Sequence, residues 1–393
     1  MSTLRLGRVL GIPVEIHWSI LGVVALITGN LAIRALPLYA PGTDLRWRLV
    51  AALVGVILFF ASILAHELGH SLVALGHGVG VSGITLWLVG GMAELDRMVP
   101  TARAEARIAA AGPAVSGLLA VFFSAVAVIG YELGAWRLAV AVAAWLGFVN
   151  LIVGVFNLAP AAPLDGGRIL TAALWRRMGD AERARVLAGR CGLVLSVLLV
   201  LGGVVQLMTV GLLEGWVMAV VGLFVFQAAR TEIRSAVVRG RLRSTPVAAL
   251  AAASPPSLPD STSVLQLGRW AGEGASRDTA YPVVRWGLEP VGYVVPGALA
   301  SIPPAQQSWT QVGQVMVRSE NVDRMEAGAS AEDVLARWDG DRSRIAVLHR
   351  GHDPAPTATL TFAQLAPLLA WPDLWGRDRN RGRTRGRHRL GAR

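Results

Sequence analysis

The stretch LVAALVGVILFFASILAHELGH, residues 49–70, determines the fold class. Its first seventeen residues carry no charged side chain, and the apolar sequence then runs without a break into His66, Glu67 and His70. An uninterrupted apolar segment of roughly 20 residues is long enough to cross the hydrocarbon core of a bilayer as a helix. Because ionisable side chains at membrane depth are costly and are functional by default, the stretch predicts a transmembrane helix with a polar site near its end.

The composition of the whole chain agrees with a membrane protein. Of its 393 residues, 53% are hydrophobic and 16% are charged, whereas an ordinary soluble domain has roughly 25% charged residues. The net charge of +11 occurs together with a mean hydropathy of +0.51. This combination is atypical of nucleic-acid-binding domains, so no nucleic acid is expected as a partner. The single cysteine, Cys191, excludes an internal disulfide framework and a thiolate metal cluster within one chain.

Six apolar stretches are expected to cross the membrane as helices, the first and last being short for a full crossing. A span needs about 18 or more apolar residues. No signal-peptide cleavage pattern follows the first stretch, so it is kept as a span. Four or five spans would also agree with the hydropathy. The expected spans are Trp18–Ile33, Leu49–Leu75, Ile108–Ile129, Leu138–Leu158, Leu187–Leu207 and Leu212–Phe226.

The arginines between these spans predict the orientation of the chain. Arginine is concentrated before the first span, after the second and fourth spans, and after the sixth. The alternate loops hold only Arg34, Arg46, Arg48 and Arg137. Since short cytoplasmic loops carry an excess of basic residues, we expect a multi-pass protein of the cell membrane with both termini in the cytoplasm.

Beyond the membrane domain, expected at residues 1–240, the sequence changes to mixed polar composition. Short strand and helix patterns alternate there and suggest two similar α/β halves in a soluble cytosolic domain at 244–371. The last stretch, 372–393, is rich in arginine and has almost nothing to bury, so a disordered tail is expected, either free or lying on anionic lipid. The patterns place strands at Tyr281–Arg285, Val291–Val295, Arg344–His349 and Thr357–Thr361 and a helix at Ala331–Trp338.

The HExxH motif at residues 66–70 has the spacing of a zinc site. Histidines at positions i and i+4 lie on one helical face and can offer two imidazole nitrogens to one zinc ion. Glu67 lies about 100° around the helix from His66, where it can reach a water molecule at the metal without being a ligand. Zinc acidifies such a water and polarises a carbonyl, and a carboxylate can pass the water's proton to a leaving amine.

A third ligand is needed, because a catalytic zinc takes three protein ligands and keeps one position open. Spacing alone offers Glu94, about where thermolysin-like enzymes have a glutamate, and His77, one residue beyond the position that metzincins use. Asp165 is the stronger candidate, since the fourth span runs inward and ends near it, at the cytosolic depth of the histidines. The alternative for Asp165 is an ordinary carboxylate in a helix-terminating turn.

The sequence around Asp165 is expected to turn this side chain back toward the helix bundle. Pro160 and Pro163 stop the fourth helix, because proline lacks a backbone N–H and clashes with the preceding turn. The two glycines that follow Asp165 are expected to let the backbone bend sharply.

Several motifs, in this order along the chain, resemble the site-2 protease family of intramembrane zinc metalloproteases. HELGH and the segment Leu164-Asp165-Gly166 carry most of the resemblance. It covers about residues 5–235 and fits the prokaryotic members. Three further stretches are similar to family signatures: GIPVEIHW at 11–18, LVGGMAE at 88–94 and AGPA at 111–114.

The resemblance implies one zinc ion per chain, bound by His66, His70 and Asp165, with Glu67 as the catalytic base. Asn157 falls where the family has an asparagine proposed to steady the oxyanion, and bonding to a neighbouring helix is the alternative role for a polar residue there. The implied reaction is regulated intramembrane proteolysis. Its implied substrate is a membrane-anchored protein such as an anti-sigma factor or a membrane-tethered transcription regulator.

A non-catalytic membrane receptor or metal-handling protein on the same fold is the alternative to a zinc metalloendopeptidase. The presence of Glu67 argues against it, because metal binding alone does not require a base beside the ligands.

Cleavage within a membrane also requires a structural element that holds the unwound substrate in an extended conformation. A substrate helix hides its peptide bonds in intrahelical hydrogen bonds and has to unwind before water can attack, and its freed backbone groups then need partners. Val79–Leu95 has no uniform helical period and contains four glycines. We expect a re-entrant β-hairpin whose edge pairs with the substrate; a plain cytosolic loop is the alternative.

The soluble halves look like a diverged pair of CBS domains, which prokaryotic members of this family often carry. Such pairs commonly bind adenine nucleotides through an acidic residue. No acid is present in the matching places, at Pro296-Gly297-Ala298 and Thr361-Phe362-Ala363-Gln364. Nucleotide binding therefore stays open, as does a dimerising role that would make the protein a homodimer.

Overall fold

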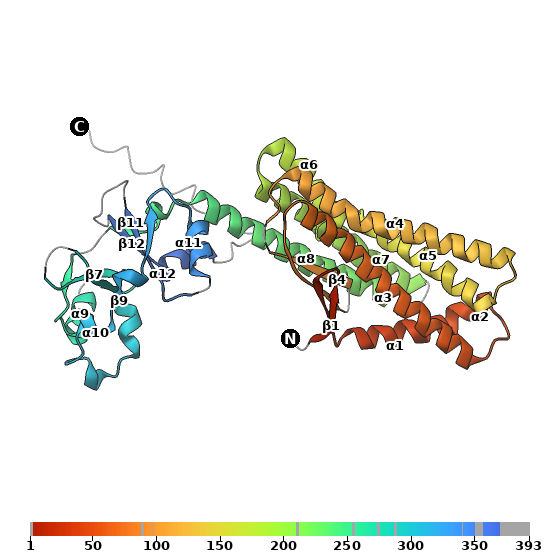
Figure 1. Cartoon of the computed structure of the whole chain (residues 1–393), viewed down its shortest axis with the longest axis horizontal. Helices are drawn as coiled ribbons and strands as arrows, with labels where there is room; N and C mark the ends of the chain where they lie inside the picture. Colours follow the sequence, from red (N-terminus) through yellow and green to blue (C-terminus); the bar gives the residue numbers. More distant parts are fainter. Residues whose placement is uncertain are drawn as a thin grey trace, which may run out of the picture. The chain divides into compact units, whose positions relative to one another are not determined.

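The computed structural model describes residues 3–87, 90–96, 98–209, 212–253, 256–272, 276–286, 289–339, 341–349 and 357–369. The chain divides into two compact units, Met1–Ala236 and Val237–Arg393 (Figure 1). The tail expected at 372–393 lies outside the described residues.

The chain contains the six long apolar helices that the sequence predicts. Within the described ranges, six helical stretches are long and apolar enough to cross a membrane. The protein is therefore a multi-pass membrane protein. The six stretches are Ile20–Tyr39, Leu45–Gly76, Ala102–Glu132, Arg137–Asn157, Ala181–Thr209 and Gly215–Ser244.

The first and last helical stretches are longer than the sequence suggested. α1 (Ile20–Asn30) continues through a π-helical turn at Leu31–Ala35 into α2 (Leu36–Tyr39). Pro37 lies in the first turn of α2, directly after the π-helical turn. α8 (Leu212–Ser244) also continues beyond its apolar part. Charged residues end a hydrophobic run without interrupting helical hydrogen bonds, so hydropathy alone underestimated both helices.

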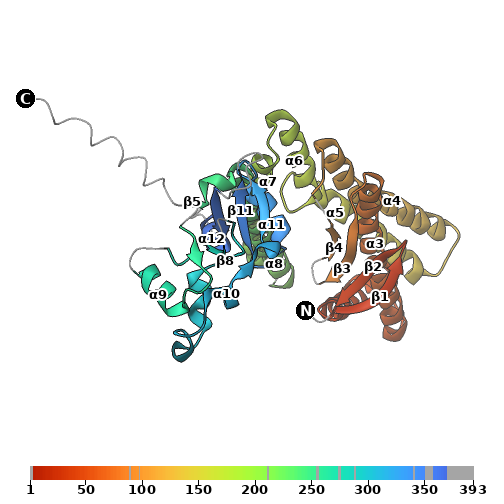
Figure 2. The same ribbon diagram turned by 60° about the vertical axis from the view of Figure 1, so that its left-hand side comes forward.

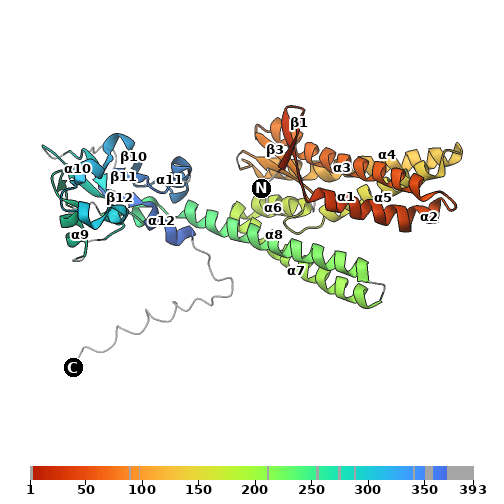
Figure 3. The same cartoon turned by 90° about the horizontal axis from the view of Figure 1, so that it is seen from below.

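Three long helices form the centre of the first unit: α3 (Leu45–Gly76), α4 (Ala102–Glu132) and α5 (Arg137–Asn157). They lie side by side (Figure 3). Gly147 of α5 lies so close to α4 that a Cβ there would be 3.0 Å from the backbone nitrogen of Ser124. Small residues at such contacts let the backbones of membrane helices approach each other.

Two more long helices, α7 (Ala181–Thr209) and α8, also pack side by side (Figure 3). Between α5 and α7 lies the short helix α6 (Asp165–Met178). The two glycines after Asp165 are part of α6, so the sharp bend expected there is instead the start of a helix. A Cβ at Gly166 would collide with the carbonyl oxygens of Leu158 and Ala159. The glycine is thus needed for close approach to the preceding loop.

A four-stranded sheet covers one side of α3 (Figure 2). Its strand order is β1-β2-β3-β4, with β2 parallel to β3 and the other neighbours antiparallel. β3 and β4 form the hairpin expected from Val79–Leu95, and β4 is an edge strand. The strands are β1 (Thr3–Val9), β2 (Ile12–His17), β3 (Val81–Trp87) and β4 (Gly90–Leu95).

The N-terminal strands were not predicted from the sequence, although their signals are visible in it. Apolar residues alternate through β2 at Ile12, Val14 and Ile16, the pattern of a half-buried strand. Leu10 and Gly11 join β1 to β2 with φ values of 52° and 84°, as in a two-residue type I′ hairpin turn. These short strands were not predicted because they lie directly before the first apolar span, which dominates the hydropathy pattern there.

The described residues of the second unit form two four-stranded sheets with the same strand pattern, together with short helices. One has the order β6-β7-β8-β9 and the other β10-β11-β12-β5. In each sheet the first two strands are parallel and the remaining neighbours antiparallel. The strands are β5 (Ala252–Ala253), β6 (Leu258–Pro259), β7 (Tyr281–Val284), β8 (Gly292–Val294), β9 (Val317–Arg318), β10 (Asp323–Glu326), β11 (Ile345–His349) and β12 (Ala358–Thr361).

The edge strands of these two sheets are exchanged between the halves. β5 precedes the first half in the sequence but pairs with β12 of the second, and β9 precedes the second half but pairs with β8 of the first. Tyr293 of one sheet and Val347 of the other belong to one buried cluster. The helices are α9 (Val264–Gly272), α10 (Val312–Val315), α11 (Ala331–Trp338) and α12 (Phe362–Leu369).

Candidate metal centre

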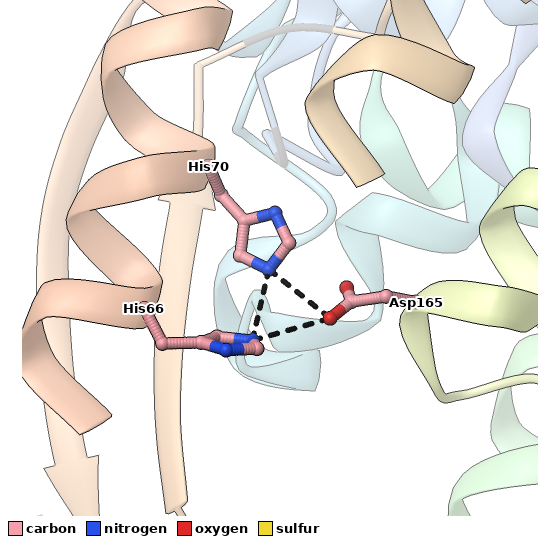
Figure 4. Close-up of side chains that lie close together, drawn as sticks. All are labelled: His66, His70 and Asp165. Carbon is pink, nitrogen blue, oxygen red and sulfur yellow. Dashed lines mark hydrogen bonds and ion pairs between the residues drawn. The ribbon is translucent and has the colours of Figure 1, made fainter. Parts of the chain in front are cut away.

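Three side chains from two helices converge in the first unit. His66 and His70 project from one face of α3, and Asp165, the first residue of α6, points toward both (Figure 4). The two Nε2 atoms are 3.2 Å apart, and each is 3.2 Å from Asp165 Oδ2. All three residues are buried, with exposed fractions of 4%, 5% and 8%.

The spacing of these donor atoms fits a zinc ion. Four ligands at tetrahedral corners about 2.0–2.1 Å from zinc lie roughly 3.3–3.4 Å from one another. The observed triangle of 3.2 Å sides is close to one face of such a tetrahedron. The fourth corner is left for a non-protein ligand, as in a catalytic zinc site.

The second nitrogens of the two imidazoles support the same conclusion. His70 Nδ1 is 2.7 Å from the carbonyl oxygen of Ile108, which can only accept, so this nitrogen carries the proton and Nε2 offers a lone pair. His66 Nδ1 is 2.8 Å from Ser116 Oγ. Metal-binding histidines have such partners, which set the tautomer and the ring orientation. Two imidazole nitrogens and a carboxylate oxygen in contact form a set of donors that a cation stabilises.

Asp165 is held in the charged form that binds metal. Burial alone would raise the pKa of its carboxyl group, but the contacts with the imidazoles of His66 and His70 outweigh burial and bring the pKa to about 2. The group is therefore ionised at neutral pH.

The backbone of α4 closes one side of the centre at Gly112. A Cβ at this position would lie against the Nε2 atoms of both His66 and His70. Any larger residue would therefore occupy the space where the ligands converge. The small residues of this helix, taken from the sequence alone, indicate only a face for helix packing. The AGPA signature at 111–114 was the signal that could have identified Gly112 as part of the centre.

Glu67 lies next to the donor triangle and touches the hairpin. A Cβ at Gly91 of β4 would collide with the side chain of Glu67. The edge strand of the sheet therefore runs directly beside this carboxylate.

The remaining candidates lie outside the cluster of three. Asn157 is the last residue of α5, and its Nδ2 donates to Val153 O of the same helix at 3.0 Å. Glu94 lies in β4. His77 directly follows the last residue of α3, and its Nδ1 is hydrogen-bonded to Val73 O. Among the described residues, the group of side chains able to hold a metal ion contains only His66, His70 and Asp165.

Comparison with known proteins gives consistent matches. The model of peptidase family M50 matches residues 54–136 and 132–200. Zinc metalloprotease Rip3 of Mycobacterium tuberculosis is 37% identical over 356 residues, which cover 88% of each chain. A zinc metalloprotease of Synechocystis sp. is 34% identical over 246 residues, covering 62% of this chain and 63% of the relative.

Two solved structures are similar to separate parts of the chain. The site-2 protease from Methanocaldococcus jannaschii is 30% identical, covers 59% of this chain and 96% of its own, and has a TM-score of 0.41. The CBS domain of the bacterial CNNM/CorC family Mg²⁺ transporter covers 38% of this chain and 93% of its own, with 12% identity and a TM-score of 0.28.

The family match and the geometry involve the same residues. The matched ranges contain both histidines of α3 as well as Asp165, and the identity to Rip3 extends over most of both chains. The chain belongs to peptidase family M50, the site-2 proteases, and is a zinc metalloprotease with a His-His-Asp metal site.

Proposed function

We propose that this protein is an intramembrane endopeptidase that hydrolyses a peptide bond in or near a transmembrane segment of a membrane-anchored protein. The observation that carries the proposal is the donor triangle of His66, His70 and Asp165 at the end of an apolar helix. A receptor that only binds metal has no need for Glu67 beside such a triangle.

The roles of the residues follow from their positions. Zinc bound at the triangle would polarise the scissile carbonyl and acidify a water molecule. Glu67, beside the ligands but not among them, takes a proton from the attacking water and delivers it to the leaving nitrogen. Asn157 is the proposed donor to the oxyanion. In the structure its amide donates to the backbone oxygen of Val153.

We also propose that β3 and β4 form a re-entrant hairpin that binds the unwound substrate as an added strand. Among the described strands, β4 has a neighbour on one side only, so its other edge offers backbone groups to an extended peptide. Gly91 of this strand lies against Glu67. A peptide paired along β4 would therefore pass close to the proposed base.

Cross-linking tests the added strand. With Cys191 replaced by serine, a Met92→Cys variant is expected to form disulfides with substrate cysteines at every second position, because alternate residues of a paired strand share one face. Met92 is exposed on β4. Leu118→Cys, exposed on α4, serves as the matched control. Equal yields at successive substrate positions, or equal yields from both variants, would count against strand pairing.

A comparison of membrane proteomes can identify the substrate. Cells with the wild-type protein are compared with cells that carry a Glu67→Gln variant, in which a trimmed but uncut substrate should accumulate. We propose an anti-sigma factor or a membrane-tethered transcription regulator as this substrate. If no membrane protein accumulates although the variant binds zinc, the receptor alternative is favoured.

Metal removal tests the function directly on the purified full chain, reconstituted in vesicles with the substrate identified in this way. Treatment with 1,10-phenanthroline should stop cleavage, and one equivalent of Zn²⁺ per chain should restore it, as measured from product bands and metal content. Mg²⁺ is the control and should not restore activity, because it prefers oxygen ligands to imidazole. Cleavage that survives complete loss of metal would refute a zinc mechanism.

We propose that both termini face the cytoplasm, as the arginine distribution favours. In this orientation the second unit is cytosolic. Its two sheets of equal strand pattern support a CBS-like pair over about 244–371 that regulates the protease or makes it a homodimer. Adenine nucleotide binding is settled by titrating the full chain with ATP and AMP.

A further inference from the structure

One face of α4 contacts the metal centre at regular intervals. Glu105, Ile108, Gly112 and Ser116 follow one another at spacings of three and four residues, so they lie on the same side of the helix. The last three meet the ligands directly: Ile108 through its carbonyl oxygen, Gly112 through close approach and Ser116 through its hydroxyl. Glu105 is the fourth member of this face, and its carboxylate pairs with an arginine.

Glu105 is joined in this way to the helix that carries the third ligand. Arg168 Nε donates to Glu105 Oε1 at 2.9 Å. Glu105 is buried, with 6% of its surface exposed, and the Arg168 side chain is 31% exposed. Arg168 is three residues after Asp165 in α6 and so lies on the same face. The ion pair thus joins α4 to the first turn of α6.

The three ligands differ in how firmly their own elements place them. The separation of His66 and His70 is set by the geometry of a single helix. Asp165 begins a separate helix after the loop that follows α5, so its distance to the histidines depends on how α6 docks. The positive charge of Arg168 also faces Asp165 itself and Glu232 of α8.

We propose that Glu105 and Arg168 are positioning residues that hold Asp165 at bonding distance from the metal. The pair uses the same face of α4 that fixes both imidazoles, so one helix sets the positions of all three ligands. Breaking the pair leaves the donor set complete but frees the first turn of α6. The expected result is weaker zinc binding with unchanged ligand identity.

The alternative is that the pair only joins two helices. A buried ion pair that loses one partner destabilises a protein wherever it lies, so stability alone does not distinguish the two roles. The chain offers a matched control in Glu182 and Arg185, an ion pair of 2.6 Å within α7 whose side chains are 9% and 11% exposed. Neither of the two helical turns that hold this pair in α7 carries a metal ligand.

The test measures zinc affinity of the purified full chain by competition with a chelator, together with the thermal unfolding of the zinc-free form. Glu105→Gln and Arg168→Gln are each expected to weaken zinc binding by about 10- to 100-fold, the usual effect of losing an outer-shell residue that orients a metal ligand. The double variant should be no weaker than Arg168→Gln alone, because Glu105→Gln removes no further part of the pair once the arginine is gone. Arg185→Gln should lower the unfolding temperature and leave zinc affinity unchanged.

Absorption of Co²⁺ in the same site supplies a second readout, since its intensity reports the coordination geometry. We expect the spectrum to change in Glu105→Gln and to stay as in the wild type in Arg185→Gln. Zinc affinity within about threefold of wild type in both variants of the pair would overturn the inference. It rests on the zinc site of the proposed function, and the two fail separately: a wild-type chain without zinc affinity overturns the site, whereas unchanged variants overturn only the positioning role.

Discussion

Replacing Glu67 with glutamine is expected to abolish cleavage while the protein keeps its zinc. The amide has almost the same shape as the carboxylate but cannot accept the proton of the attacking water, and loss of a general base costs roughly 10²- to 10⁴-fold in rate. The metal ligands are unchanged, because Glu67 is not one of the three converging donors. Product formation in reconstituted vesicles and metal content by mass spectrometry are measured on the same sample.

Glu132→Gln provides the control for this prediction. Glu132 is exposed and is the last residue of α4, at the opposite end of that helix from Glu105. The control should cleave at the wild-type rate and bind one zinc. If Glu67→Gln also cleaved at the wild-type rate, another group would have to act as the base. If it lost zinc, Glu67 would contribute to metal binding.

Adding a single methyl group at Gly112 is expected to remove the metal. A Cβ there would lie against the Nε2 atoms of both His66 and His70, and the contact atoms are the ligand atoms themselves. α4 is held in place by close packing against α5 and cannot withdraw at low cost. We expect Gly112→Ala to lose most of its zinc, and cleavage in the same proportion, while the helices still form. Metal content and circular dichroism measure the two effects.

Gly117→Ala is the matched control, five residues further along the same helix. A Cβ at Gly117 meets no atom within 4 Å, so this variant adds the same methyl group to α4 without a collision. Alanine also favours a helix over glycine by about 0.8–1.0 kcal/mol, so the control should be at least as stable as the wild type. Full zinc occupancy in Gly112→Ala would show that the imidazoles have room to move aside.

The sequence predicts the metal ligands well because their arrangement is mostly local. The histidines of HExxH share a helical face by their spacing alone, and hydropathy defines the helix that carries them. The sequence favours Asp165 because an inward span ends beside it, and the structure brings it into contact with both histidines. The six apolar helices follow from length and composition.

The parts that the sequence did not predict depend on contacts between distant segments. Gly112 looks like any small residue of a membrane helix until its neighbours across the helix interface are known. The same is true of Glu105 and Arg168, which are 63 residues apart. Strand β2 pairs with β3, although the segment from α1 to α3 separates the two strands in the sequence. No local pattern specifies such a partner. The sequence predicts a sharp bend at the glycines after Asp165, whereas in the structure they allow close packing at the start of α6.

The exchange of edge strands in the second unit limits which deletions and duplications this part of the protein can tolerate. Each half supplies the outermost strand of the other half's sheet. A gene shortened by one half would leave the surviving sheet without its last strand and with an open row of backbone groups, a template for aggregation. Deletions, duplications and domain grafts should therefore be tolerated only when their breakpoints enclose both halves. The two halves therefore form a single structural module, although the sequence suggests two separate domains.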